Sequence, residues 1–455
     1  MAKTYDRTKG NVTSVILKFY FPMLLTNMLQ QLYTLADTAI VGKGLGDNAL
    51  AAVGNMSSLT FLVIGFSMGL SNGFSVSIAQ SFGAKDYNKM RRATAASIKL
   101  AAIISVVLTI LSMASLRAVL NILQTDSVIM NDSLKYGYVI FGGLVATIAY
   151  NLCACVLRAL GDSKTPFIAI IISAIANVIL NYVCIYILGT GVEGAAAATV
   201  ISQVLSTAIC LVKLRRIDIL RLSREDFTAC SQMYPELFRN GLPMALMNSI
   251  TAVGCMVVQY FVNGLGVAYT SAFSPCSRYL NLFMQPACTA GFAMSSFTSQ
   301  NFGAKKFDRI RSGLHVCVSI ALVTYFTLGS VMFFFPEWLA SLMLNSSETI
   351  ALAAEYLKIC GMMVFAVDLL FVFRSGCQGM GRPFIPMISG IIEMIMRISI
   401  IVIFIGRFGF SAAAWADVAA WLGALALNLT AFEVYLNRYT RCGKKPLPKA
   451  EPALS

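Results

Sequence analysis

The chain has 455 residues, of which 57% are hydrophobic and 12% are charged, and its mean hydropathy is +0.73. Soluble domains carry about a quarter charged residues, so this composition excludes a soluble globular protein. The formal net charge is +14. In a soluble protein that charge would suggest nucleic acid, but the basic residues here follow the loops of a membrane protein, and we expect no nucleic-acid partner.

Apolar runs predict about twelve membrane-spanning helices, because one span needs about 20 residues. In chain order we expect helices at residues 14–42, 51–79, 93–114, 134–158, 166–188, 194–214, 237–263, 267–299, 313–335, 354–378, 386–406 and 411–436. A polar, basic stretch at residues 213–240 separates the first six helices from the last six. The small-residue run at 65–79 is expected to let helices approach closely.

The predicted fold class is an all-α polytopic membrane protein with two six-helix bundles. We expect an N-terminal lobe over residues 1–215, a cytoplasmic connector over 216–236, and a C-terminal lobe with a short cytoplasmic tail over 237–455. Most of the 35 Lys and Arg residues fall in or beside loops on the side of the two termini. The positive-inside rule therefore predicts that both termini are cytoplasmic. We expect no removable signal peptide, because the first apolar segment is long and contains an acid.

The two halves repeat each other at an offset of about 220 residues. The loop SFGAKDYNKMRR (81–92) matches NFGAKKFDRIRS (301–312), and Gly46 matches Gly266. An even number of helices per half makes the two repeats parallel, with a pseudo-two-fold axis along the membrane normal. Two parallel bundles beside a central cavity are typical of a transporter.

Several motifs carry a family resemblance. They are Pro22, Gln30-Gln31-Leu32-Tyr33 and Asp37-Thr38-Ala39-Ile40-Val41-Gly42 in the first helix, the paired FGAK loops, Arg158-Ala159-Leu160-Gly161-Asp162 with Pro166, and Asn177 and Asn181 followed by Gly194 to Thr199. In these motifs the chain resembles the multidrug and toxic compound extrusion (MATE) transporters over essentially its full length. The residues look closest to the DinF-like branch of that family.

Four acids fall inside predicted spans: Asp37, Asp368, Glu393 and Asp417. A charged side chain at the centre of the bilayer costs at least about 2.5 kcal/mol on insertion scales. Such acids are therefore candidates for function or for ion pairs. Asp37 is the acid without an obvious partner, because no Lys or Arg lies deep in the helices of its own lobe.

Helix lengths place Asn177, Asn181 and Thr199 at a depth similar to that of Asp37, in the outer half of the membrane. Together they offer a carboxylate, two amides and a hydroxyl, which suit a small hard cation or a carboxylic acid that needs hydrogen-bond partners. The alternative is that the Asn and Thr side chains only bond neighbouring helices.

The resemblance implies that these four residues form the cation-coupling site. It also implies that Gln30, Tyr33 and Asn151 line a neighbouring cavity and that Pro22 lets the first helix bend. The chain departs from many relatives at Asn181, where they carry a second acid.

The missing acid bears on the coupling ion. Na⁺ prefers several oxygens with anionic charge, so a single carboxylate makes a weak Na⁺ site. Burial disfavours the ionised form of a lone Asp, so Asp37 can load and unload a proton. We therefore favour H⁺ over Na⁺, with Na⁺ at the Asp37 cluster as the alternative, and expect no other metal and no cofactor.

The second lobe combines three acids with two cations in its spans. Glu393 and Arg397 are four residues apart and can meet on one helix face. Asp368, Asp417 and Arg278 complete the candidates. This group can contact substrate, bind a second ion or form a structural network.

Sequence features argue against an enzyme. Two G-x-S-x-G patterns at 65–69 and 69–73 lie in a hydrophobic helix rather than in a strand-turn-helix elbow. The only histidine, His315, is far from them on the predicted topology. No P-loop is present, so ATP is not expected to drive the protein directly.

We expect a secondary active antiporter of the cytoplasmic (plasma) membrane. The protein is expected to come from a prokaryote and to be a monomer in the lipid bilayer. It would export amphipathic drugs and xenobiotics, in particular organic cations, by alternating access between the two bundles. One alternative keeps the fold and moves lipid-linked substrates as a flippase. A second alternative is a non-transporting receptor or a membrane enzyme.

Overall fold

Helices make up nearly all of the computed structural model, which describes residues 6–122 and 125–443, and no β-strand occurs in these ranges. The first lobe contains α1 (Val12–Leu45), α2 (Asp47–Gly83), α3 (Tyr87–Ile122), α4 (Ser127–Gly142), α5 (Leu144–Ala159), α6 (Lys164–Tyr182), the π-helix η1 (Val183–Ile187) and α7 (Gly191–Arg215). Three short helices follow: η2 (Asp218–Leu220), α8 (Arg224–Thr228) and η3 (Ala229–Met233). They fall within the predicted connector.

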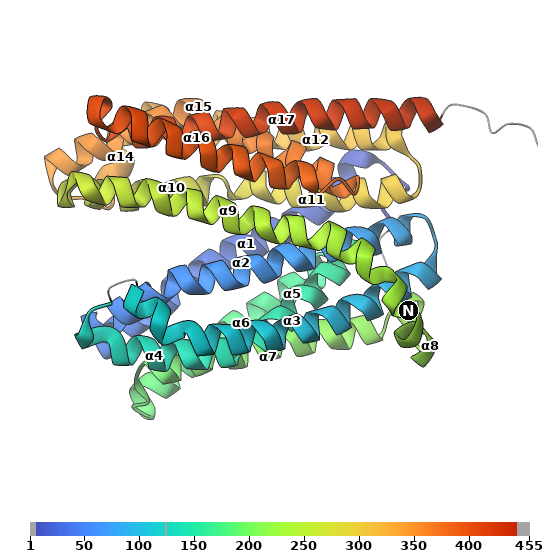
Figure 1. Cartoon of the computed structure of the whole chain (residues 1–455), viewed down its shortest axis with the longest axis horizontal. Helices are drawn as coiled ribbons and strands as arrows, with labels where there is room; N and C mark the ends of the chain where they lie inside the picture. Colours follow the sequence, from blue (N-terminus) through green and yellow to red (C-terminus); the bar gives the residue numbers. More distant parts are fainter. Residues whose placement is uncertain (1–5, 123–124, 444–455) are drawn as a thin grey trace, which may run out of the picture.

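The second lobe begins at Tyr234. It contains α9 (Tyr234–Leu265), α10 (Val267–Phe283), α11 (Gln285–Gly303), α12 (Phe307–Thr324), η4 (Tyr325–Gly329), α13 (Ser330–Phe334), α14 (Pro336–Ser341), α15 (Ser347–Gly379), α16 (Phe384–Phe408) and α17 (Ser411–Gly443). The lobes lie one above the other in Figure 1, and the described chain begins and ends at the same end of the molecule. We call this the terminal end; it includes the loops at 84–86, 160–163 and 304–306.

Ten helical segments of the described chain are long and apolar enough to cross a membrane, and α4 with α5, bent by 45° at Gly143, adds an eleventh. The predicted span at 267–299 is the one that does not qualify. It is divided at Met284 into α10 and the Ser- and Thr-rich α11, which has Pro286 in its first turn. The fourth and eighth predicted helices are therefore each a broken pair, because a Gly or a Pro interrupts the helical hydrogen bonding.

The internal repeat is visible in the backbone. Positive φ angles recur 220 positions apart, at Gly46 and Gly266, Lys85 and Lys305, Gly161 and Gly381, and Gly189 and Gly409. A positive φ is uncommon for a residue other than glycine, so the shared values at the two lysines show that the FGAK loops adopt the same turn. The two lobes thus share local conformation as well as sequence.

Helix α1 crosses from one lobe to the other. Near its start, Phe19 and Tyr20 lie in the buried core of the second lobe. Near its end, Val41 lies in a separate core of the first lobe. Pro22 lies inside the helix within the first of these regions, just before the core residue Met23. A proline there removes one helical hydrogen bond and permits bending.

Close glycine contacts seal the space between the lobes at the terminal end. A Cβ atom on Gly83 of α2 would collide with the backbone carbonyl of Gln300 in α11, and a Cβ atom on Gly303 would collide with that of Gln80. Only glycine allows the two helix ends to approach this closely. The chain segment before α1 covers the same region, since the backbone N–H of Arg7 donates to Gln300 Oε1 at 2.9 Å.

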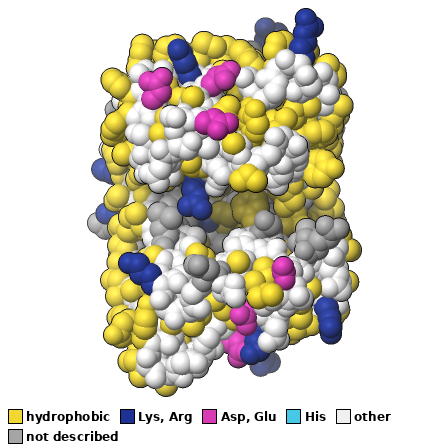
Figure 2. Space-filling model, turned by 90° about the vertical axis from the view of Figure 1, so that its left-hand side faces the viewer, with side chains coloured by type: hydrophobic (Ala, Val, Ile, Leu, Met, Phe, Trp, Pro, Cys, Tyr) yellow, Lys and Arg dark blue, Asp and Glu magenta, His cyan; other side chains and the backbone are white. Residues whose placement is uncertain are grey.

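The lobes separate at the opposite end. Figure 2 looks onto that end and shows a hollow between the upper and the lower half of the molecule. Nearer the terminal end, α2 packs against α9 through Gly69 and Gly73, where added Cβ atoms would meet backbone atoms of Ala245 and Asn240. This contact confirms that the small-residue run allows close helix approach. The structure is therefore closed at the terminal end and open at the other.

Candidate functional site

Asp37 joins a chain of polar side chains inside the first lobe. Asn181 Nδ2 donates to Asp37 Oδ1 at 2.5 Å and also lies 2.8 Å from Asn177 Oδ1, and Asn177 Nδ2 lies 3.4 Å from Thr199 Oγ1. Both asparagines are fully buried, while Asp37 is half-buried. The structure thus brings together the four residues that helix depth alone placed at one level.

No Lys or Arg of the described chain forms an ion pair with Asp37. Its carboxylate is held by an amide, and Asn181 Oδ1 has no hydrogen-bond partner among the described residues. The site therefore has an unused acceptor beside a single acid. Such a site can hold a proton, because a protonated carboxyl group needs an acceptor.

A small cavity of about 20 Å³ lies beside this cluster, between α1, α6 and α7, and its lining includes Gln30, Tyr33, Ser173 and Ser202. Gln30 and Tyr33 thus lie where the resemblance implies. Asn151 is not among the lining residues; it belongs to α5, and its Nδ2 is buried without a partner among the described residues.

The equivalent region of the second lobe holds a closed ion pair. Arg397, which is the repeat equivalent of Asn177, donates through Nε to Asp417 Oδ1 at 2.7 Å. Tyr356 donates to the other carboxylate oxygen of Asp417 at 2.6 Å. The charges of Arg397 and Asp417 therefore compensate each other, and this carboxylate differs from the unpaired Asp37.

Glu393 connects this pair to a further arginine. The predicted i, i+4 contact is present, with 3.6 Å between Arg397 Nη1 and Glu393 Oε2. The closer partner of Glu393 is Arg374, which also donates to Ser389 at 3.0 Å. Sequence reasoning missed Arg374, which lies inside the predicted helix at 354–378; a complete count of the charges in the spans would have found it.

Arg278 does not join this network. It is exposed on α10 and forms no ion pair with the described residues. The intramembrane cations that pair with the second-lobe acids are therefore Arg374 and Arg397, and Arg278 cannot serve as a partner in this conformation.

Among the four intramembrane acids, Asp368 is the one whose carboxylate has no partner among the described residues. Its side chain is 1% exposed, and neither carboxylate oxygen has a hydrogen-bond partner among the described residues. It lies within electrostatic reach of Tyr20 on α1 and of Cys288 on α11. A buried carboxylate without a partner is costly, so this environment favours the protonated acid. The absence of a partner, inferred from sequence for Asp37, thus describes Asp368 better.

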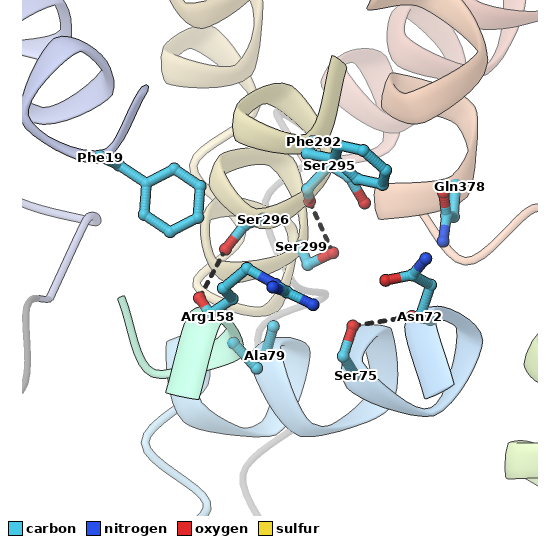
Figure 3. Close-up of a pocket in the computed structure, with 11 residues that line it drawn as sticks. Phe19, Asn72, Ser75, Ala79, Arg158, Phe292, Ser295, Ser296, Ser299 and Gln378 are labelled. Atoms are coloured by element: carbon cyan, nitrogen blue, oxygen red, sulfur yellow. Dashed lines mark hydrogen bonds between the residues drawn. The ribbon is translucent and has the colours of Figure 1, made fainter. Parts of the chain in front are cut away.

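A small cavity of about 30 Å³ lies between the lobes, just before the seal at the terminal end, and polar side chains form much of its lining. Figure 3 shows the side chains of Arg158, Asn72 and Gln378 directed toward its interior. Arg158 of α5 and Gln378 of α15 are repeat equivalents, so each lobe contributes the same position. Phe19 of α1 and Phe292 of α11 also line this cavity.

Comparisons with known proteins identify the family. The MatE family model matches residues 22–183 and 243–403, one match in each lobe. The multidrug resistance protein YoeA of Bacillus subtilis (strain 168) is 28% identical over 366 residues, which cover 78% of this chain and 79% of that protein. The multidrug resistance protein YpnP of the same strain is 26% identical over 432 residues, which cover 94% of this chain and 93% of that protein.

A solved structure of a MATE protein in the bent conformation has the same fold. Its TM-score is 0.91 at 21% sequence identity, and the alignment covers 97% of this chain and 100% of that chain. This confirms the predicted all-α fold with two six-helix bundles, while the DinF-like branch stays a prediction. Because the family model matches most of the length of both lobes, the chain belongs to the MatE family of multi-pass membrane transporters.

Proposed function

We propose that the protein is a proton-coupled antiporter that exports amphipathic organic compounds, drugs included, across the cytoplasmic membrane. The observation that carries this proposal is the position of α1. This one helix carries Asp37 in the first lobe, and its other half lies in the core of the second lobe near Asp368. The names of the relatives, which are multidrug resistance proteins, support the substrate class.

The proposed orientation places the terminal end in the cytoplasm. It rests on the concentration of Lys and Arg in the loops of that end. The hollow at the opposite end then faces outward, and the glycine seal closes the cytoplasmic side. The described conformation would be the outward-facing state of an alternating-access cycle.

In the proposed cycle, a proton enters from outside and binds Asp37. Protonation converts its carboxylate from a pure acceptor into a donor, and the free acceptor Asn181 Oδ1 is available to receive that hydrogen bond after a small rotation. The contact between α1 and α6 changes, and α1 can bend near Pro22. Protonation drives transport only if it favours one conformation over the other, because a ligand shifts an equilibrium by its differential affinity.

The acids of the second lobe differ in their proposed roles. Glu393 and Asp417 are paired with arginines, so their charges are compensated in place. Breaking a buried pair is strongly unfavourable, which suits a structural role. Asp368 has no partner and is the second proposed proton site.

A flippase for lipid-linked substrates is the alternative function on this fold. Binding a pyrophosphate group would require several free cations in the cavity. Arg374 and Arg397 are already paired with acids, and among the described residues Arg158 is the single cation in the lining of the cavity between the lobes. One free cation supports the antiporter over the flippase.

The test is transport by purified protein in proteoliposomes, with a fluorescent organic cation as the probe. An imposed pH gradient is compared with an imposed Na⁺ gradient. The proposal expects uptake or release driven by the pH gradient, and expects Asp37→Asn to lower the rate at least about tenfold, because one coupling site is lost.

Glu193→Gln is the matched control, since Glu193 is an exposed acid paired with Lys135 at 2.9 Å. It should keep the wild-type rate. Full antiport by Asp37→Asn would show that Asp37 is not the coupling acid. Transport driven only by the Na⁺ gradient would show that Na⁺, and not H⁺, is the coupling ion. No transport under either gradient would overturn the proposed function.

A further inference from the structure

The cavity between the lobes carries a positive charge that no acid neutralises. Arg158 forms no ion pair with the described residues, and no Asp or Glu lines the cavity. The guanidinium Nη2 contacts Cys155 Sγ at 3.1 Å. Asp162, four residues further along, instead accepts hydrogen bonds from Lys164 and Thr165 at the start of α6. The remaining N–H groups of Arg158 are therefore available to a ligand.

Two amide groups add donors beside Arg158. Gln378 is 7% exposed, and its side chain has no hydrogen-bond partner among the described residues. Asn72 accepts a contact from Cys155 Sγ through Oδ1 at 3.2 Å, which leaves its Nδ2 group unused. Figure 3 shows both amides directed toward the interior of the cavity, near Arg158. Arg158 and Asn72 belong to the first lobe and Gln378 to the second.

The walls add aromatic surface, and a second arginine, Arg7, lies nearby within electrostatic reach of Asp162. Phe19 of α1 and Phe292 of α11 both line the cavity. Arg7 lies over the ring of Phe19, with its guanidinium carbon 3.5 Å from the ring centroid, and its two Nη atoms have no hydrogen-bond partner among the described residues. The cavity is thus bounded by two aromatic rings and lies near two arginines.

We propose that this cavity is an oxyanion subsite that binds the carboxylate of an amphipathic aromatic substrate. Arg158 would hold the carboxylate through its fork of N–H donors, which matches the geometry of a carboxylate. Gln378 and Asn72 would complete the hydrogen bonds. The cavity of about 30 Å³ has room for the carboxylate alone, so the aromatic part would lie outside it, beside Phe19 and Phe292 at the cavity wall. The subsite would then extend the substrates from organic cations to zwitterions and organic anions.

This assignment rests on the proposed function, because it treats the space between the lobes as the substrate path. The subsite draws groups from both lobes, so its geometry changes when the lobes move relative to each other. A ligand bound there has different affinities for the two conformations, as alternating access requires.

The test is binding of two rhodamine dyes, one with a free carboxyl group and the other its methyl ester, to the purified full-length protein. Fluorescence polarisation gives the Kd of each dye. Arg158→Gln should weaken binding of the acid at least about tenfold, a loss of about 1.4 kcal/mol, and leave binding of the ester unchanged. Gln378→Arg should strengthen binding of the acid, a gain that misfolding cannot produce.

Arg224→Gln is the matched control, since it removes an exposed arginine of α8 far from the cavity. Equal effects of Arg158→Gln on acid and ester, no effect on the acid, or no binding of the acid to wild type would each overturn the subsite. Transport of the ester dye in proteoliposomes is measured separately. Failure of that transport counts against the proposed function, while the comparison of acid and ester binding still decides the subsite.

Discussion

Gln80 and Gln300 are equivalent residues of the two lobes, and each donates a hydrogen bond to the backbone of the opposite lobe. Gln80 Nε2 lies 2.9 Å from the carbonyl oxygen of Gly379, and Gln300 Nε2 lies 2.7 Å from that of Ala159. The acceptors are themselves repeat equivalents. The seal at the terminal end is therefore built twice by the internal repeat, and both halves must open together.

The first prediction concerns this seal. Gly83→Val places a side chain against the backbone of Gln300, so the terminal end cannot close in the described arrangement. We expect faster hydrogen exchange in residues 80–86 and 300–306, measured by mass spectrometry, because these helix ends lose their protected contact.

Gly54→Val is the control for this experiment, since it adds the same side chain to α2 at a position with open space around it. Its exchange at the seal should match that of wild type. Unchanged protection in Gly83→Val would mean that the glycine contact does not hold the seal.

The second prediction concerns the buried ion pair of the second lobe. Arg397→Met leaves Asp417 without its cation in a buried position, and breaking such a pair costs about 3–5 kcal/mol. We expect a lower free energy of unfolding, measured by thermal or denaturant unfolding in detergent. The double variant with Asp417→Asn should recover part of the loss, because it removes the uncompensated charge.

Arg311→Met provides the comparison. Arg311 and Glu433 form an exposed pair at 3.3 Å, and exposed pairs contribute about 0–1 kcal/mol. If the two variants lose equal stability, the buried network does not carry the structural role assigned to it.

The third prediction concerns the pH dependence of the connector. Burial raises the pKa of Asp226 in α8, but the backbone N–H and hydroxyl of Ser223 and the nearby Arg91 favour the charged form more strongly, so its pKa lies below the ordinary value of 3.8. A group whose pKa is lower in the folded state than in the unfolded state stabilises the fold at pH values above its unfolded pKa. That stability is lost as the pH falls through the folded pKa. The helix start should therefore weaken in acid.

Limited proteolysis of residues 216–233 at neutral pH and at about pH 3 measures this effect. Asp226→Asn should make the connector more accessible at neutral pH, because the loss of a capping side chain costs about 1 kcal/mol. It should also remove the pH dependence of cleavage. If cleavage of Asp226→Asn depends on pH as in wild type, another acid causes the pH dependence.

The fourth prediction tests the choice of ion. Asn181→Asp would place a second carboxylate beside Asp37, which lies 2.5 Å from Asn181 Nδ2. Two anionic oxygens suit Na⁺ better than one, so the variant should gain stability in NaCl relative to choline chloride. At a Na⁺ concentration of about ten times the Kd, the gain is about 1.4 kcal/mol.

Asn121→Asp, which adds an acid at an exposed position of α3, should show no such difference. Wild type should also be insensitive to Na⁺. A strong Na⁺ effect on wild type would indicate that the existing cluster already binds the ion.

The sequence by itself determined the fold class and the repeat, because both depend on local information. Runs of apolar residues predict spans, and identical turn motifs such as the FGAK loops adopt the same conformation wherever they occur. Helix rise also sufficed to place Asn177 and Asn181 at the level of Asp37. Depth along a helix is a one-dimensional quantity, and residue counting measures it directly.

Only the tertiary structure decided which charges are paired. Residue counting does not report how helices are rotated against one another, so it could not show that Glu393 meets Arg374 while Asp368 meets no cation. The sequence also did not predict that α1 crosses between the two lobes or that the guanidinium of Arg158 is unpaired. Each depends on contacts between residues far apart in the chain, and packing of side chains in three dimensions selects among those contacts.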